Sequence, residues 1–189
     1  MSLTEAIALI IVKKNEIFYS VVNKEITTFL TKNAIKEIIE TFSKIIIERT
    51  IDGACSIDLE SEQIEISELR KYMLHCIKFQ EGEGIAFITN KKYKERVAFS
   101  FILKLKDIVD KTLLTTMFYE SNDPAKIDTI EKINKDLREL KIVMHKNIES
   151  VLARGEKIET LILKTQALSE NSKRFYVTAK KMNSCCVVM

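Results

Sequence analysis

A heptad repeat in the last third of the chain restricts the fold more than any other feature. Alternate steps of three and four residues from Ile130 reach sixteen positions, and eleven of them carry a large apolar side chain. The positions are Ile130, Ile133, Leu137, Leu140, Met144, Asn147, Val151, Arg154, Ile158, Leu161, Thr165, Leu168, Ser172, Phe175, Ala179 and Met182. A single helix over these 53 residues would be about 80 Å long, with one narrow seam that it cannot bury against itself. The repeat over 130–182, which we call the heptad segment, therefore predicts a helix that needs partner helices.

The polar residues in this seam indicate what kind of partner it needs. Arg154 lies in the middle of the seam, where a guanidinium with five donors is costly to bury unless oxygen atoms accept from it. Two copies would face each other in a parallel homodimer, whereas glutamines from other helices would satisfy the arginine and fix the register. Gly155 costs an isolated helix about 1 kcal/mol relative to alanine. We therefore expect the segment to be loosely folded until partners bind.

The first part of the chain predicts a hairpin followed by a helix. Two apolar, β-branched stretches at 6–12 and 17–22 surround Lys13 to Glu16, which is typical of a β-hairpin with a four-residue loop. Asn33 can cap the helix that follows. Its apolar stripe consists of Ile35, Ile38, Ile39, Phe42, Ile45 and Ile46. These positions repeat with the period of a helix that buries one face.

Further strands and a second helix complete a predicted α+β domain. Residues 55–59 and 63–66 are weaker strand candidates, and 72–79 and 85–89 are firmer ones. A second helical stripe follows at Val97, Ala98, Phe101, Ile102, Leu105, Ile108 and Val109. The short connections favour an antiparallel sheet covered by helices. Asp123 before Pro124 predicts a helix start, so we expect a domain at 1–123, a helical segment at 124–182 and a tail at 183–189.

The tail ends in a signal for lipid attachment. Cys186, Val187, Val188 and Met189 form a C-a-a-X sequence, and the final methionine favours a farnesyl chain. One lipid chain gives only marginal membrane binding. Cys185, as a palmitoyl or second prenyl acceptor, would supply the second anchor. The sequence thus predicts a prenyltransferase as a partner and membrane contact through lipid.

Composition excludes several other classes of protein. The longest apolar run, 6–12, is far shorter than the roughly 20 residues of a membrane-spanning helix. A net charge of +3 with interleaved acidic and basic residues does not indicate nucleic-acid binding. The four cysteines do not form a disulfide framework, which fits a reducing cytosol. His75 and His145 lack metal-ligand spacing, and no glycine begins a phosphate-binding loop. We therefore expect no metal, no cofactor and no enzymatic activity.

A family resemblance rests on the run Glu149-Ser-Val-Leu-Ala-Arg154-Gly-Glu-Lys157, the sixteen-position spacing and the doubled cysteine tail. These features resemble the R-SNARE motif of the prenylated Ykt-type longin SNAREs. The order hairpin, helix, meander, helix is similar to their longin domain. The resemblance implies a longin (profilin-like) fold, with a five-stranded antiparallel sheet and helices on both faces, followed by a long coiled-coil SNARE motif. The region between Lys111 and Pro124 is shorter than in the family, which leaves the last longin helix open.

The resemblance also implies a function. Arg154 would be the central ionic layer, and the other fifteen heptad positions the core layers, of a bundle with three Q-SNARE helices that drives vesicle fusion. Family members fold the helix and lipid back onto the longin domain, and the candidate autoinhibitory groove is Phe42, Ile38, Ile39 and Ile45. The implied location is cytoplasmic, reversibly associated with Golgi, endoplasmic reticulum and endosomal membranes. The alternative is a lipid-anchored coiled-coil adaptor or tether that binds one helical partner without driving fusion.

Overall fold

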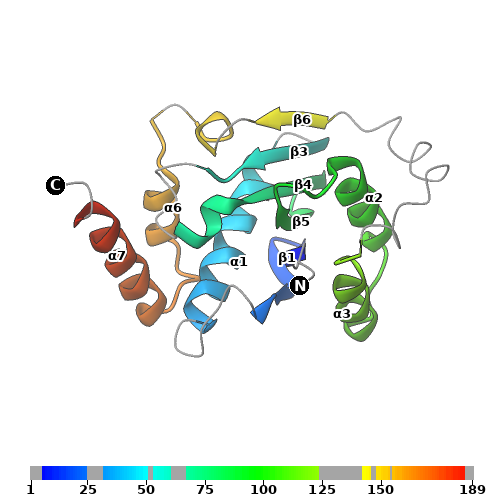
Figure 1. Ribbon diagram of the computed structural model, residues 1–189, viewed down its shortest axis with the longest axis horizontal. Helices are drawn as coiled ribbons and strands as arrows, with labels where there is room; N and C mark the ends of the chain where they lie inside the picture. The colour runs from blue at the N-terminus through cyan, green and yellow to red at the C-terminus, as the bar shows by residue number, and fades with distance from the viewer. Residues whose placement is uncertain are drawn as a thin grey trace.

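A mixed sheet with helices on both faces organises the described part of the chain (Figure 1). The computed structural model describes residues 6–24, 32–50, 53–60, 67–123, 142–145, 148–153 and 155–185. The strands are β1 (Ala6–Lys13), β2 (Glu16–Val22), β3 (Gly53–Asp58), β4 (Tyr72–Gln80), β5 (Glu83–Asn90) and β6 (Ile142–His145). Among these residues they form a six-stranded sheet in the order β2-β1-β5-β4-β3-β6. The α+β class is confirmed.

The helices divide between the two faces of the sheet. They are α1 (Lys32–Arg49), α2 (Glu95–Leu105), α3 (Lys111–Glu120), α6 (Ile158–Lys164) and α7 (Glu170–Cys185), with short 3₁₀ turns η2 (Ser67–Lys71) and η3 (Ile148–Ser150). Figure 1 shows α2 and α3 on one side, and α1 on the other with α6 and α7 beyond it. Each face has its own hydrophobic cluster. The predicted arrangement of helices on both faces is confirmed.

The hairpin between β1 and β2 closes more tightly than the sequence indicates. The expected four-residue loop is a two-residue turn, because Lys14 and Asn15 both have positive φ, 53° and 61°. Turns of this kind match the twist of the flanking strands. The Asn15 N–H donates to the Gly82 carbonyl at 3.0 Å, which joins this turn to the one between β4 and β5. Gly82 has φ +74°, and a Cβ there would lie 2.8 Å from Asn15 Oδ1.

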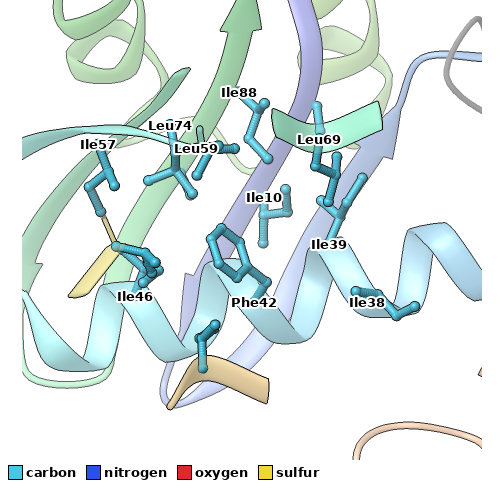
Figure 2. Packing of buried hydrophobic residues seen from close by; sticks show 14 of the residues in the cluster. Ile10, Ile38, Ile39, Phe42, Ile46, Ile57, Leu59, Leu69, Leu74 and Ile88 are labelled. Carbon is cyan, nitrogen blue, oxygen red and sulfur yellow. The ribbon is translucent and has the colours of Figure 1, made fainter. Parts of the chain in front are cut away.

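Helix α1 buries its apolar stripe as the periodicity predicts. Ile35, Ile38, Ile39, Phe42 and Ile46 are each at most 5% exposed. Figure 2 shows Phe42 and Ile39 pointing from α1 toward sheet residues such as Ile10. Full burial of side chains of this size contributes about 1.5–3 kcal/mol each. The stripe is therefore a large part of the attachment of α1 to the sheet.

On the other face, the second predicted helix ends earlier and a third one follows. Helix α2 stops at Leu105, and Val109, which the stripe included, is 68% exposed. The reason is Asp110, whose carboxylate accepts from the N–H groups of Thr112 at 2.8 Å and Leu113 at 3.3 Å and so begins α3. Helix α3 lies in the region between Lys111 and Pro124, where the sequence left the last helix of the domain open.

The predicted number of strands requires one correction. The sheet has β6 in addition to the five expected strands, because Ile142–His145, expected to be helical, pairs in parallel with β3. This pairing occupies the N–H and C=O groups at the outer edge of β3, which a sheet edge otherwise leaves open. The strand expected at 63–66 and the helix start at Pro124 lie outside the described residues.

His75 is a core residue of this sheet. It is 1% exposed, and Ser56 Oγ lies 2.7 Å from its Nδ1 and Thr89 Oγ1 lies 3.0 Å from its Nε2. Burial lowers the pKa of His75 to about 3, so the ring is neutral at physiological pH. The described residues include no group of three or more His, Cys, Asp or Glu placed to hold a metal ion.

Candidate functional site

The candidate functional site is the surface on which the end of the chain folds back against its beginning. Strand β6 extends the sheet beside β3, with Ala54 opposite Ile142 and Ile57 opposite His145. Helices α6 and α7 then lie beside α1 (Figure 1). Segments more than a hundred residues apart in the sequence therefore form one hydrophobic cluster.

The heptad segment is not one continuous helix in this arrangement. Its described parts are β6, η3, α6 and α7, in contrast to the 53-residue helix that the repeat predicts. Gly155 has φ +85°, a conformation that a helix does not contain, and the Glu156 N–H donates to the Ala153 carbonyl at 2.9 Å in this turn. Buried apolar residues of the segment share one hydrophobic cluster with α1 instead of forming a single seam along one helix.

The buried side chains of the heptad segment belong partly to the heptad positions and partly to the positions beside them. Its members that are at most 9% exposed are Ile148, Leu152, Ile158, Ile162, Leu168 and Tyr176. Ile158 and Leu168 are heptad positions, and the other four each follow one. The heptad residues Val151, Leu161 and Phe175 are only partly buried in the same cluster. Sequence reasoning missed this second set, although its members are apolar and directly adjacent to the repeat.

The four groove residues predicted on α1 all belong to this cluster. Phe42, Ile38 and Ile39 are 3%, 1% and 0% exposed, and Ile45 is partly buried. Figure 2 shows that Ile38 extends on a different side of α1 from Phe42, which points to the sheet. Helix α1 therefore packs on the sheet with one side and on the folded-back segment with another.

Arg49 and Glu37 on α1 make polar contacts with the folded-back segment. Arg49 Nη2 lies 2.7 Å from Glu156 Oε1, and these side chains are 41% and 27% exposed. An exposed pair of this kind contributes at most about 1 kcal/mol. Glu37 Oε2 accepts from the backbone N–H of Ser169, directly before α7, at 2.9 Å. Apolar burial therefore stabilises the folded-back arrangement more than these polar contacts do, and the polar contacts fix the position of α6 and α7.

Comparisons with known proteins agree with this combination of a sheet domain and a heptad segment. The Synaptobrevin family model matches residues 129–188. A protein named "Synaptobrevin homolog YKT6" from Debaryomyces hansenii is 34% identical over 181 residues, covering 86% of each chain. The protein of the same name from Schizosaccharomyces pombe is 33% identical over 85% of each chain. The protein of that name from Saccharomyces cerevisiae is 31% identical over 85% of this chain. The chain belongs to the Ykt-type R-SNARE family.

Membership of the Ykt-type R-SNARE family sets the class of function. The chain is an R-SNARE of vesicle trafficking, its partners are other SNARE proteins, and proteins of this class are not enzymes. Within the described part of the chain, every helix is too short or too polar to cross a membrane.

Several of the predicted R-SNARE positions lie outside the described residues. They are Ile130, Ile133, Leu137, Leu140, Asn147, the central Arg154 and the lipidation residue Cys186. Met144 lies in β6, and Cys185 is the last residue of α7. Of the remaining core layers, Ser172 is 1% exposed, Thr165 and Ala179 are half-buried, and Met182 is 68% exposed.

Glu37 provides a test of the folded-back arrangement in this Ykt-type chain. Partial burial raises the pKa of Glu37, but hydrogen bonds from the Ser169 N–H and the hydroxyls of Ser172 and Ser169 outweigh it and leave the pKa below its ordinary value. The ionised carboxylate therefore favours the folded-back state. This contribution is present above the ordinary pKa of 4.5 and is lost as the pH falls through the lowered value.

We expect Glu37→Ala to loosen α7 by about 1 kcal/mol at neutral pH, as loss of a helix cap does. Hydrogen exchange of the α7 amides should accelerate about fivefold, and the difference from the natural chain should disappear in acid. Glu48→Ala is the control, because Glu48 lies on the same helix and is 49% exposed. Equal exchange rates at neutral pH in the Glu37→Ala and natural chains would contradict this role.

Proposed function

We propose that this R-SNARE assembles with three Q-SNARE helices to drive membrane fusion, and that the folded-back arrangement is its inactive state. One observation carries the proposal. Ile158, Leu168 and Ser172, which would be core layers of the bundle, are 0%, 4% and 1% exposed against the remainder of the chain. A side chain buried there is not available to partner helices. The two states therefore compete for the same residues.

The two states also require different backbone conformations of the heptad segment. A four-helix bundle needs one continuous helix through the heptad segment, whereas β6 is extended and Gly155 has a positive φ. Assembly thus requires β6 to leave β3 and the turn at Gly155 to become helical. The first domain, 1–123, keeps its own sheet and two-faced core during this change. The proposal takes 124–182 as the SNARE motif and 183–189 as the tail.

The tail supplies the proposed attachment to the membrane. We assign a prenyl chain to Cys186 because it begins the C-a-a-X sequence, and a palmitoyl or second prenyl chain to Cys185. Two chains give stable anchoring, whereas one gives reversible binding. This difference accounts for a cytoplasmic form and a form bound to Golgi, endoplasmic reticulum or endosomal membranes. The longin domain regulates the exchange by holding the SNARE segment.

The test is assembly of the chain, truncated before Cys185, with three Q-SNARE helices. We expect a gain in helical circular dichroism and an equimolar four-component complex on size exclusion. Arg154→Gln should lower the stability of that complex by about 2 kcal/mol or more, because charge-assisted hydrogen bonds to the glutamines are lost. Lys157→Gln is the matched control, because it removes the same charge from an exposed position outside the seam.

The alternative of an adaptor or tether has a distinct result. A complex with one helix only, with equal stability in the Arg154→Gln and natural chains, would establish the adaptor and overturn the fusion proposal. The lipid assignment is tested separately, by mass of the tail after incubation with a farnesyl donor and prenyltransferase. Cys186→Ser should abolish the added mass, and Cys185→Ser should leave it.

A further inference from the structure

The outer edge of β2 is open in the part of the chain that the structure describes. β2 is the last strand in the sheet order, and its ladder is with β1. A strand at a sheet edge presents alternate N–H and C=O groups that can pair with another extended chain. At the opposite end of the sheet the terminal strand is β6. Of these two end strands, β2 is the one that lies beside a cavity, which Val21, Val22 and Tyr119 help to line.

Helix α3 forms one wall beside this edge. Tyr19 Oη and Thr115 Oγ1 are 2.8 Å apart, which places the middle of α3 against the middle of β2. One turn further along α3, Tyr119 lines the same cavity as Val21. Tyr119 is 49% exposed, so much of its ring faces solvent rather than the core.

Helix α1 forms the other wall. The Ser20 hydroxyl donates to Glu40, which places this part of α1 beside β2. Lys36 and Lys32, one and two turns earlier on the same helix, line the cavity with Val22. Lys36 Nζ is 3.6 Å from Glu40 Oε1, and the Lys36 side chain is 45% exposed, so the ammonium has further donors for a ligand. The edge of β2 therefore lies at the bottom of a groove between two helices.

The lining of this groove is basic and partly apolar. A cavity of about 220 Å³ is lined by Val21, Val22 and Tyr119 together with Lys24, Lys32 and Lys36. Three lysines line the cavity, and the carboxylate of Glu40 contacts two of the lining residues, Lys36 and Ser20, so that lysines outnumber carboxylates among the described residues there. Two copies of the chain meeting at this edge would bring these lysines together, and like charges directly opposed are destabilising. The charge therefore disfavours a second copy and favours an acidic occupant.

We propose that an extended, acidic segment of a partner protein binds in this groove as an added strand on β2. Its backbone pairs with the open edge. Its apolar side chains on the α3 side contact Val21 and Tyr119, and its carboxylates on the α1 side face Lys32 and Lys36 beside Val22. Strand addition of this kind takes affinity from backbone hydrogen bonds and specificity from the side chains along the groove. The groove is separate from the surface that holds β6, α6 and α7, so both can be occupied at once.

The test uses a short synthetic peptide that alternates carboxylate residues with valine, and a matched peptide with lysines in place of the carboxylates. Both are titrated into the isotopically labelled full chain and followed by amide NMR. We expect the acidic peptide to shift the amides of β2 and of residues 32–36, more weakly as salt is added. The basic peptide should produce no such shifts.

Charge-reversal variants test whether the lysines of the groove bind the acidic peptide. Lys32→Glu with Lys36→Glu should weaken binding of the acidic peptide about tenfold. Lys92→Glu with Lys94→Glu, which reverses two exposed charges before α2, should leave it unchanged. The proposal is overturned if the acidic peptide leaves β2 unchanged at millimolar concentration, or if both pairs weaken binding equally. It is also overturned if the groove binds only anionic vesicles, or if β2 shifts only as the chain dimerises.

Discussion

Gly155→Ala should move the R-SNARE toward its assembly-competent state by about thirtyfold. In the folded-back state this residue has φ +85°, where an L-alanine costs about 1–2 kcal/mol. In a continuous helix the same substitution gains about 1 kcal/mol. No atom of the described residues lies within 4 Å of the added Cβ, so the effect is on the backbone. The two effects act in one direction and together amount to about 2 kcal/mol or more.

Two measurements check this expectation. The β6 amides should exchange with solvent about thirtyfold faster in Gly155→Ala, and assembly with Q-SNARE helices should accelerate in proportion. Ala153→Gly is the reciprocal control, because it lowers helix propensity at an exposed residue in the same turn. That variant should assemble more slowly. If Gly155→Ala assembles at the natural rate, opening of this turn is not the step that limits assembly.

Ile162→Asp should abolish the folded-back state while leaving the partner bundle intact. Ile162 is 2% exposed in the cluster with α1 but lies outside the heptad seam. A carboxylate buried there without a partner costs several kcal/mol. In a four-helix bundle the same position lies beside the seam, where a charged residue is tolerated. The substitution should therefore destabilise the folded-back state and leave the stability of the four-helix bundle unchanged.

Leu161→Asp is the matched variant with the opposite profile. Leu161 is a core layer of the proposed bundle and is only partly buried in the folded-back cluster. It should weaken the four-helix complex strongly and open the free chain less than Ile162→Asp does. Fluorescence transfer between α1 and α7 measures opening, and thermal melting of the complex measures bundle stability. Equal effects of the two substitutions on both readouts would mean that the two states do not use separate residues.

The parts of the fold that follow from local pattern were predictable from the sequence. The stripe on α1 has a strict helical period, and Ile38, Ile39 and Phe42 are buried as that period indicates. The β4–β5 hairpin follows from two apolar runs around Gly82. The heptad and the cysteine tail identified the R-SNARE resemblance, which the relatives confirm. Each of these signals is contained within one element.

The parts that depend on distant partners were not predictable. Ile142–His145 is helical by its heptad context, but it pairs in parallel with β3, a contact with a distant segment that no local pattern contains. A pattern based on one seam predicts that side chains adjacent to the repeat are exposed to solvent. This prediction is wrong for Ile148, Leu152, Ile162 and Tyr176. Helix α3 starts at the cap Asp110. The sequence pattern did not indicate this start, because the apolar stripe of the preceding helix continues to Val109.

Release of β6 has a consequence for the colloidal behaviour of the protein. Departure of this strand uncovers the edge of β3 from Ala54 to Ile57, and departure of α6 and α7 uncovers apolar side chains of α1. An uncovered strand edge beside an apolar surface promotes aggregation. The concentration of the opened chain is therefore limited by its solubility as well as by the supply of partners. If the folded-back state is the inactive one, as we propose, it also keeps these surfaces covered until partner helices bind.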